Sequence, residues 1–146
     1  MVGPGTFFVT KNLESRCPIL CHKHGDILPA NIVVETLFPA AREERIHLAA
    51  FCVMPDHWHA LFGLIRDEGE GVPPPTEPDD RLSLSKGMRL INSSIGRHTG
   101  SILNTRAAVW QDGYHETRIR STKQFEHILR YIEHNPVNGG FCQNNT

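Results

Sequence analysis

IHLAAFCVM (residues 46–54) and HWHALFGLI (residues 57–65) are two apolar segments of strand length, separated only by Pro55 and Asp56. Proline and aspartate favour tight turns, because proline fixes its own backbone and aspartate can bond to the main chain that follows it. Short apolar runs bounded by such residues are typical of buried strands. The stretch therefore predicts a β-hairpin at the centre of the fold.

The segments on either side of the hairpin predict the remaining elements by their apolar spacing and their end signals. The expected elements are a strand over 5–10, a helix from about Pro29 to the charged residues 42–45 that Pro39 could shorten, a helix over 81–98 with a basic face, a strand over 107–120 broken around Asp112 and Gly113, and a helix from Ser121 or Thr122 to Pro136. This order predicts an α+β fold of ferredoxin-like type, an antiparallel sheet with helices on one face.

Acids, glycines and prolines dominate residues 66–80, so this segment cannot bury apolar surface and we expect a mobile connector there. The whole chain of 146 residues has the length of one domain, and we expect a single domain over residues 1–146. The four cysteines are few for a disulfide scaffold and are expected to be reduced thiols.

The formal net charge of −1 at pH 7 argues against a protein that coats nucleic acid indiscriminately, although a local basic patch stays open. No apolar run approaches the roughly 18 residues of a membrane span, and the N-terminal sequence MVGPGTFFVT lacks a secretory pattern. We therefore expect a cytoplasmic protein without a membrane partner.

Two histidines stand one residue apart in the second strand of the hairpin, so His57 and His59 point to the same face of the sheet. Two neighbouring imidazoles can hold one cation, but hydrogen-bonded or surface histidines would show the same spacing. In the last expected helix, Tyr131 and Asn135 are four residues apart and share a face. They meet the histidines only if that helix packs beside the hairpin, and Tyr131 could instead be a core aromatic.

Three segments in a fixed order carry a family resemblance: FCVMPDHWHALFGLI at 51–65, VWQDGYHETRIR at 109–120 and RYIEHNPVNGGF at 130–141. Together they resemble the REP-associated tyrosine transposases, which are single-tyrosine members of the HUH endonuclease superfamily. The resemblance implies a ferredoxin-like fold with a C-terminal catalytic helix. It also implies a Mg²⁺ or Mn²⁺ ion held by His57 and His59 with Asn135 as third ligand, and Tyr131 as nucleophile.

The implied activity is metal-dependent cleavage and joining of single-stranded or hairpin DNA. An ordinary tyrosine phenol has a pKa of about 10, so at neutral pH it is a poor nucleophile unless a nearby cation favours its ionised form. A divalent cation also acts as a Lewis acid on the scissile phosphate. Attack by Tyr131 would give a 5′-phosphotyrosine and a free 3′-hydroxyl, and a second 3′-hydroxyl could later join strands without ATP.

Such an enzyme is expected to be cytoplasmic and nucleoid-associated, as a monomer or homodimer in which Tyr131 serves its own subunit or its partner's. DNA contacts are predicted for six basic and aromatic residues. These are Arg89, Arg97, Trp110, Tyr114, Arg118 and Arg120. The arginines could instead form a solvated face, Trp110 could belong to the core, and Tyr114 could be structural. The low net charge and the acidic connector are unusual for a transposase.

Several alternatives stay open at this point. His134 could replace Asn135 as a metal ligand, and Asn135 could brace the helix end instead. The loop CPILCHKH, residues 17–24, carries two cysteines and two histidines that could bind zinc, although the spacing is tighter than in common zinc fingers. The function could accordingly be that of an inactive hairpin-DNA-binding protein of the same fold, or of a zinc-stabilised interaction domain.

Overall fold

The computed structural model describes residues 5–15, 18–65, 69–73 and 76–139, with side chains up to residue 134. Four strands form one antiparallel sheet: β1 (Thr6–Asn12), β2 (Ile46–Val53), β3 (His57–Leu64) and β4 (His115–Arg118). Their order across the sheet is β2-β3-β1-β4. The predicted hairpin is β2 and β3, and the strand order with its intervening helices confirms the ferredoxin-like α+β fold.

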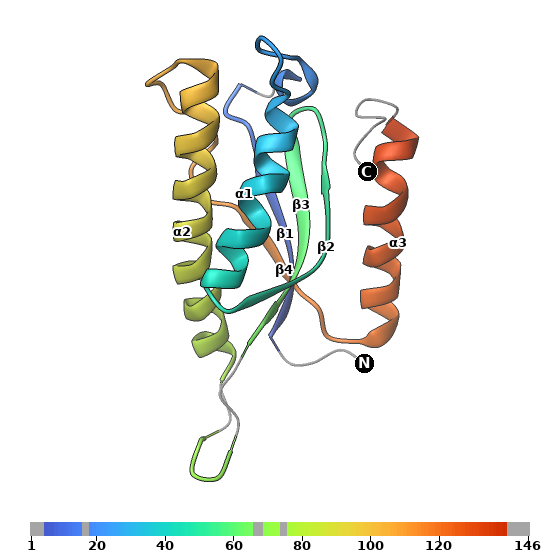
Figure 1. Cartoon of the computed structure of the whole chain (residues 1–146). Helices are drawn as coiled ribbons and strands as arrows, with labels where there is room; N and C mark the ends of the chain where they lie inside the picture. The colour runs from blue at the N-terminus through green and yellow to red at the C-terminus, as the bar shows by residue number, and fades with distance from the viewer. Residues whose placement is uncertain (1–4, 16–17, 66–68, 74–75, 140–146) are drawn as a thin grey trace.

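The described chain also contains a short 3-10 helix, η1 (Ile19–Cys21), and the helices α1 (Pro29–Glu43), α2 (Glu77–Leu103) and α3 (Thr122–Gly139). Figure 1 shows α1 and α2 side by side on one face of the sheet and α3 on the opposite face. The helices expected on one face are therefore α1 and α2, while the C-terminal helix covers the other.

The alternation of side chains along β3 divides the core into two parts. Trp58 and Phe62 are fully buried on the face covered by α1 and α2. Leu61 points the other way and packs with Ile132 of α3. Burying a side chain of this size stabilises a protein by about 1.5–3 kcal/mol, so both layers contribute to the fold. Because the histidines of β3 share the parity of Leu61, they lie on the face covered by α3.

The predicted bounds of α1 are confirmed, since the helix continues through Pro39 and ends at Glu43, within the charged residues 42–45. The bounds of the next two helices differ from the prediction. The connector predicted over 66–80 ends earlier, because α2 already begins at Glu77 and extends to Leu103. The side chain of Thr76 accepts a hydrogen bond from the backbone of Asp79, whose carboxylate accepts one from Thr76 in return, and this reciprocal cap starts the helix.

The end of the last helix also differs from the prediction. Pro136 was expected to stop α3, but the helix extends to Gly139. A proline near the end of a helix removes only one backbone hydrogen bond from the last turns, so three more residues can keep a helical backbone.

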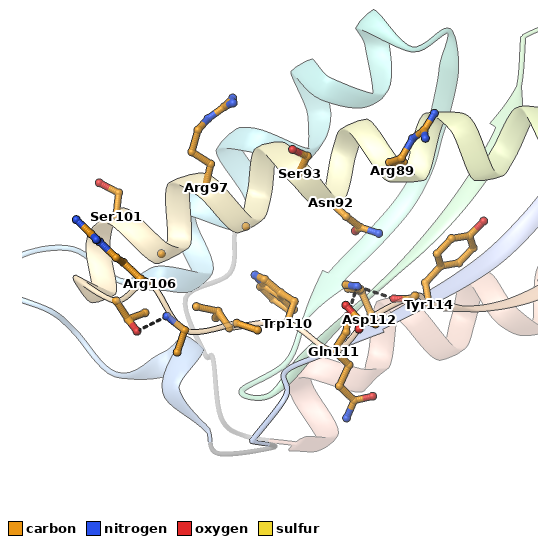
Figure 2. Close-up of a pocket in the computed structure, with 18 of the residues that line it drawn as sticks. Arg89, Asn92, Ser93, Arg97, Ser101, Arg106, Trp110, Gln111, Asp112 and Tyr114 are labelled. Atoms are coloured by element: carbon orange, nitrogen blue, oxygen red, sulfur yellow. Dashed lines mark hydrogen bonds between the residues drawn. The ribbon is translucent and has the colours of Figure 1, made fainter.

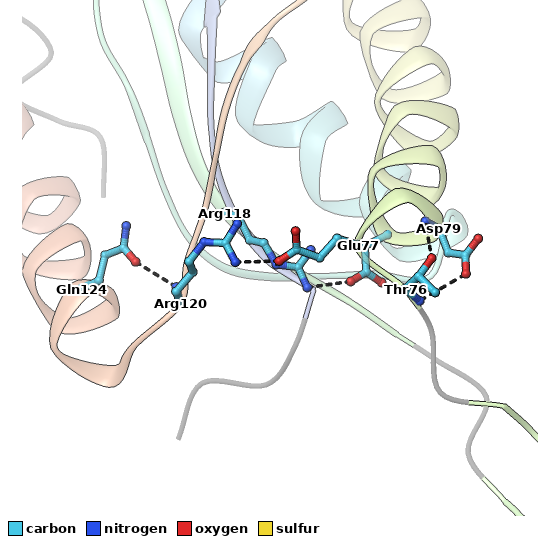
Figure 3. Close-up of polar contacts among 7 residues, drawn as sticks. Thr76, Glu77, Asp79, Arg118, Arg120 and Gln124 are labelled. Atoms are coloured by element: carbon cyan, nitrogen blue, oxygen red, sulfur yellow. Dashed lines mark hydrogen bonds and ion pairs between the residues drawn. The ribbon is translucent and has the colours of Figure 1, made fainter.

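Two arginines near β4 form ion pairs with the first turn of α2 (Figure 3). Arg118 Nη2 donates to Oδ2 of Asp80 at 2.8 Å, and Asp80 is 3% exposed. Arg120 Nη1 donates to Oε1 of Glu77 at 2.6 Å. The guanidinium of Arg118 also lies 5.5 Å from the centre of the Phe7 ring. These contacts join β4 to the start of α2.

The cysteine prediction is confirmed for one residue and wrong for another. Cys52 is a buried, reduced thiol in β2. Cys21 is disulfide-bonded, so it is not the reduced thiol that was expected. Cys17 lies outside the described residues. The zinc site considered for residues 17–24 includes Cys17, so the described residues contain only part of it. No helix in the described part of the chain is long and apolar enough to cross a membrane.

Candidate active centre

His57 and His59 face one another at the start of β3. Their Nε2 atoms are 3.1 Å apart, and their ring centres are 4.6 Å apart. The strand geometry explains the approach, because residues two apart on one strand present neighbouring side chains on the same face. His59 is 6% exposed, so the pair lies at the edge of the core rather than in free solvent.

Each imidazole is held from behind through its other nitrogen. Nδ1 of His57 lies 2.7 Å from Oδ1 of Asp56, and Nδ1 of His59 lies 2.8 Å from Oγ1 of Thr10. A carboxylate accepts the Nδ1 proton and leaves Nε2 of His57 with a free lone pair. The hydroxyl of Thr10 can accept or donate, so it permits either tautomer of His59. These two partners orient both Nε2 atoms toward the same point.

The sequence interpretation missed both partners. Asp56 was assigned only to the hairpin turn, although its place directly before His57 was a signal that could have suggested a second role. Thr10 gave no such signal, because its place opposite His59 follows from the pairing of β1 with β3.

The donor set fits a divalent cation. Burial, with the nearby His57 ring, lowers the pKa of His59 to about 4, so this imidazole is neutral at pH 7 and has a lone pair to offer. Two imidazole nitrogens facing one another, each supported by an outer hydrogen bond, suit a transition-metal ion such as Zn²⁺ and favour Mn²⁺ over Mg²⁺.

A complete ligand set is not found within the described residues, because no group of three or more His, Cys, Asp or Glu side chains there could hold a metal ion. The predicted third ligand is an amide, and the side chain of Asn135 lies outside the described part of the structure. His134, the alternative, is exposed, and its Nδ1 donates a hydrogen bond of 2.9 Å to the carbonyl of Arg130 on the same helix. The third ligand therefore stays a prediction.

Tyr131 lies beside the histidine pair. Its ring centre is 5.6 Å from that of His59 and 6.3 Å from that of Phe8, with both pairs in an edge-on arrangement. Tyr131 is 48% exposed, whereas Ile132, the next residue of α3, is buried against the sheet. A phenol at this place is open to a large substrate on one side and lies edge-on against the His59 ring on the other.

The second tyrosine is in a different environment. Tyr114 lines a groove on the side of the sheet that α2 covers, and its hydroxyl is hydrogen-bonded with Ser85. Burial, together with the Glu116 carboxylate, raises the pKa of Tyr114, which makes its phenolate harder to form. Tyr114 is therefore poorly suited to act as a nucleophile.

The groove brings together four of the six residues predicted to contact DNA. It has a volume of about 890 Å³ and lies between α2 and residues 104–114 (Figure 2). The four residues are Arg89, Arg97, Trp110 and Tyr114. Trp110 is only 8% exposed and its Nε1 donates to the hydroxyl of Thr99 at 3.0 Å, so it forms a wall of the groove.

The other two predicted DNA contacts lie elsewhere. Arg118 and Arg120 form the ion pairs with Asp80 and Glu77, outside both the groove and the histidine pair. Their guanidinium groups have a structural role in joining β4 to α2, so we do not include them in a DNA-binding surface.

Comparisons with known proteins bear on this geometry. No family model matches the sequence. The chain is 28% identical over 139 residues to the REP-associated tyrosine transposase of Escherichia coli (strain K12). The aligned residues cover 95% of this chain and 70% of that protein. A solved structure of a REP-associated tyrosine transposase bound to a REP hairpin matches with a TM-score of 0.66 and 25% identity, over 96% of this chain and 71% of the other.

The chain is therefore similar to the REP-associated tyrosine transposases in both sequence and fold. A second solved structure, of a protein from Deinococcus radiodurans R1 described as a transposase, has the same fold, with a TM-score of 0.54 and 20% identity over 91% of this chain and 92% of the other. The resemblance of the three sequence segments to REP-associated tyrosine transposases is thereby confirmed, and so is the fold that it implied.

Proposed function

We propose that this protein is a metal-dependent endonuclease and strand transferase that cuts single-stranded DNA beside a hairpin, with Tyr131 as the nucleophile. The observation that carries the proposal is the position of the Tyr131 ring, 5.6 Å from His59 and exposed on one side. The relationship to transposases, and the REP hairpin bound in one of the similar structures, supports hairpin DNA as the partner.

In the proposed reaction the phenol oxygen of Tyr131 attacks the phosphorus and the bond from phosphorus to the 3′-oxygen breaks. The phenol gives up its proton, the 3′-oxygen gains one, and the 5′-phosphate stays on the tyrosine. A second 3′-hydroxyl can attack the phosphotyrosine and release Tyr131, which joins two strands with no change in the number of phosphodiester bonds.

The residues of the chain bind, orient and expose the reacting groups. Asp56 and Thr10 hold the rings of His57 and His59, and a divalent cation held there with Asn135 would supply Lewis-acid stabilisation of charge on the phosphate. The ring of Phe8 stacks on His59 and contacts the ring of Tyr131 edge-on, and so helps to hold the phenol beside the histidine pair.

The test is the capture of the covalent adduct. The protein is incubated with Mn²⁺ and a labelled hairpin oligonucleotide from the DNA flanking its gene, denatured, and separated by electrophoresis. We expect a labelled adduct that maps by mass spectrometry to the peptide containing Tyr131, and no adduct with Tyr131→Phe. Thermal unfolding of this variant should match the parent, because Tyr131 is half exposed and keeps its ring.

Two results would contradict the proposal. An adduct that persists in Tyr131→Phe, or maps to the peptide containing Tyr114, would assign the nucleophile wrongly. Tight hairpin binding without an adduct under any of Mg²⁺, Mn²⁺ or Zn²⁺ would favour the alternative of an inactive hairpin-binding protein.

A further inference from the structure

A third histidine lies on the same face of the sheet as the histidine pair. In the antiparallel ladders, Thr10 of β1 is paired with His59 on one side and with His115 of β4 on the other. Residues paired directly across neighbouring strands point to the same face. The imidazole of His115 therefore belongs to the face that carries His59, and the proposed reaction gives it no role.

The residues on either side of His115 agree with this orientation. Arg118 points to the opposite face, where its guanidinium is bound to Asp80 of α2. Tyr114 lies on that opposite face too, because it lines the groove beside α2. Side chains alternate along a strand, and His115 directly follows Tyr114. The His115 side chain therefore points away from α2.

The half of this face formed by β1 and β4 is open to a substrate. Helix α3 packs on β2 and β3 instead. His115 and Thr117 of β4 are exposed, and Phe8 and Thr10 of β1 are half-buried. Among the described residues, the imidazole of His115 has neither a hydrogen-bond partner nor an ion-pair partner. It is therefore available to a group bound on the open half of the face.

The distance across the sheet suits one phosphate group. Neighbouring strands lie about 4.8 Å apart, so the Cα atoms of His59 and His115, which are two strands apart, are separated by about 10 Å. The short side chain of Thr10 lies between them, and its hydroxyl is bonded to His59. A phosphodiester over Thr10 would have His59 on one side and His115 on the other.

The phenol approaches this position from the side away from β4. The ring of Tyr131 lies 5.6 Å from that of His59, and its helix packs on β2 and β3, at the other side of the sheet from β4. In displacement at phosphorus, the attacking and leaving oxygens lie roughly in line on opposite sides of the phosphorus. When Tyr131 attacks from the side of β3, the departing 3′-oxygen faces β4 and His115.

We propose that His115 is the general acid of strand cleavage, and that its imidazolium gives a proton to the departing 3′-oxygen. The bond from the Tyr131 oxygen to phosphorus forms, the bond from phosphorus to the 3′-oxygen breaks, and the phenol proton passes to water. In the joining step the neutral imidazole takes the proton of the incoming 3′-hydroxyl and returns to its charged form. An imidazole can both give and accept a proton near neutral pH, which suits both steps. The inference rests on the proposed function, because it adds a residue to the same reaction.

The test replaces the departing oxygen by sulfur. The cleavage step is first located with the parent protein and a labelled hairpin oligonucleotide, which is then made with oxygen or sulfur at the bridging 3′ position. A thiolate leaves without a proton near neutral pH, since an ordinary thiol has a pKa of about 8.5, whereas an alkoxide needs one. We expect His115→Gln to slow adduct formation about 10²–10⁴-fold on the oxygen substrate, and to match the parent on the sulfur substrate.

Two controls separate proton transfer from other effects of the substitution. His47→Gln removes an exposed imidazole from the same face at the other end of the sheet, where His47 is paired with Gly63, and should leave both rates unchanged. The thermal unfolding of His115→Gln, and its affinities for Mn²⁺ and for the uncut hairpin, should match the parent, because His115 is exposed and unpartnered among the described residues. These three readouts need no cleavage.

The outcomes separate this inference from the proposed function. If the parent forms the adduct and His115→Gln is as fast as the parent on the oxygen substrate, the assignment of His115 is wrong and the proposed function stands. The same holds if His115→Gln is slowed equally on oxygen and sulfur, or loses Mn²⁺ affinity or thermal stability, because its role would then be structural. If the parent forms no adduct with either substrate, the proposed function fails and the inference fails with it.

Discussion

The hydroxyl of Thr10 should control how tightly the histidine pair binds a divalent cation. Thr10→Val keeps the shape and β-branching of the side chain but removes the hydrogen bond of 2.8 Å to Nδ1 of His59. In the parent, both Nε2 lone pairs can face a cation only when the Thr10 hydroxyl accepts the Nδ1 proton. In Thr10→Val, the Nδ1 proton of the buried His59 ring has no acceptor whenever the Nε2 lone pair of that ring faces the cation.

The expected magnitude follows from the nature of the two supporting groups. Loss of an outer partner of a histidine ligand typically lowers metal affinity about 10–100-fold. A neutral hydroxyl belongs near the lower end, so Thr10→Val should raise the Kd for Mn²⁺ about tenfold, or about 1.4 kcal/mol. Asp56→Asn removes a charged acceptor from His57 and should cost more, toward a hundredfold.

The assay is a calorimetric titration of Mn²⁺ into metal-free protein near neutral pH, with Thr10→Ser as the matched control. Serine keeps the hydroxyl and should bind Mn²⁺ within about threefold of the parent, a difference of less than 1 kcal/mol. Thermal unfolding of each metal-free variant checks that the sheet is intact. A Thr10→Val protein that folds normally and binds Mn²⁺ as tightly as the parent would refute the role given to Thr10 and to the face-to-face imidazoles.

Two other pairs of substitutions test the packing that positions the sites. Gly96→Ala in α2 should raise the free energy of unfolding, measured in urea, by up to about 1 kcal/mol, because its added Cβ would meet no atom within 4 Å. Gly87→Ala on the same helix should gain less, because its added Cβ would displace the terminal methyl of the buried Ile46 side chain. A destabilised Gly96→Ala would contradict the open space at that position. Arg118→Met should cost about 3 kcal/mol, because its partner Asp80 is a buried carboxylate. Arg120→Met, whose ion pair is exposed, should leave the unfolding midpoint almost unchanged, and equal losses for the two arginines would refute this distinction.

The elements were predictable from the sequence where one local pattern decided them. The hairpin follows from two apolar runs around Pro55 and Asp56, and the shared face of His57 and His59 follows from strand alternation alone. The start of α2 was not predicted, because the acids and prolines around it have the composition of a disordered connector. The signal that marks the start is the capping pair of Thr76 and Asp79, which composition alone hides.

The site residues were predictable only where their role did not depend on a distant partner. Arg118 is a residue type that often contacts phosphate, but it is bound by the carboxylate of Asp80, which lies 38 residues earlier in the chain. Thr10 supports His59 across 49 residues, which only the register of β1 on β3 can reveal. The approach of Tyr131 to His59 likewise depends on α3 crossing to the far face of the sheet. Long-range pairings of this kind leave no local trace in composition or periodicity.

One strand determines the placement of residues on both faces of the sheet. Along β1, Thr10 points to the face of the histidine pair and Lys11 to the face of the groove beside α2, since successive side chains alternate. Shifting β1 by one residue against its neighbours would exchange the two, so one register places Thr10 between His59 and His115. The two histidines are therefore coupled through folding but separate in their chemistry. Substitutions that keep β1 in register, such as Thr10→Val and His115→Gln, should impair metal binding and proton transfer independently.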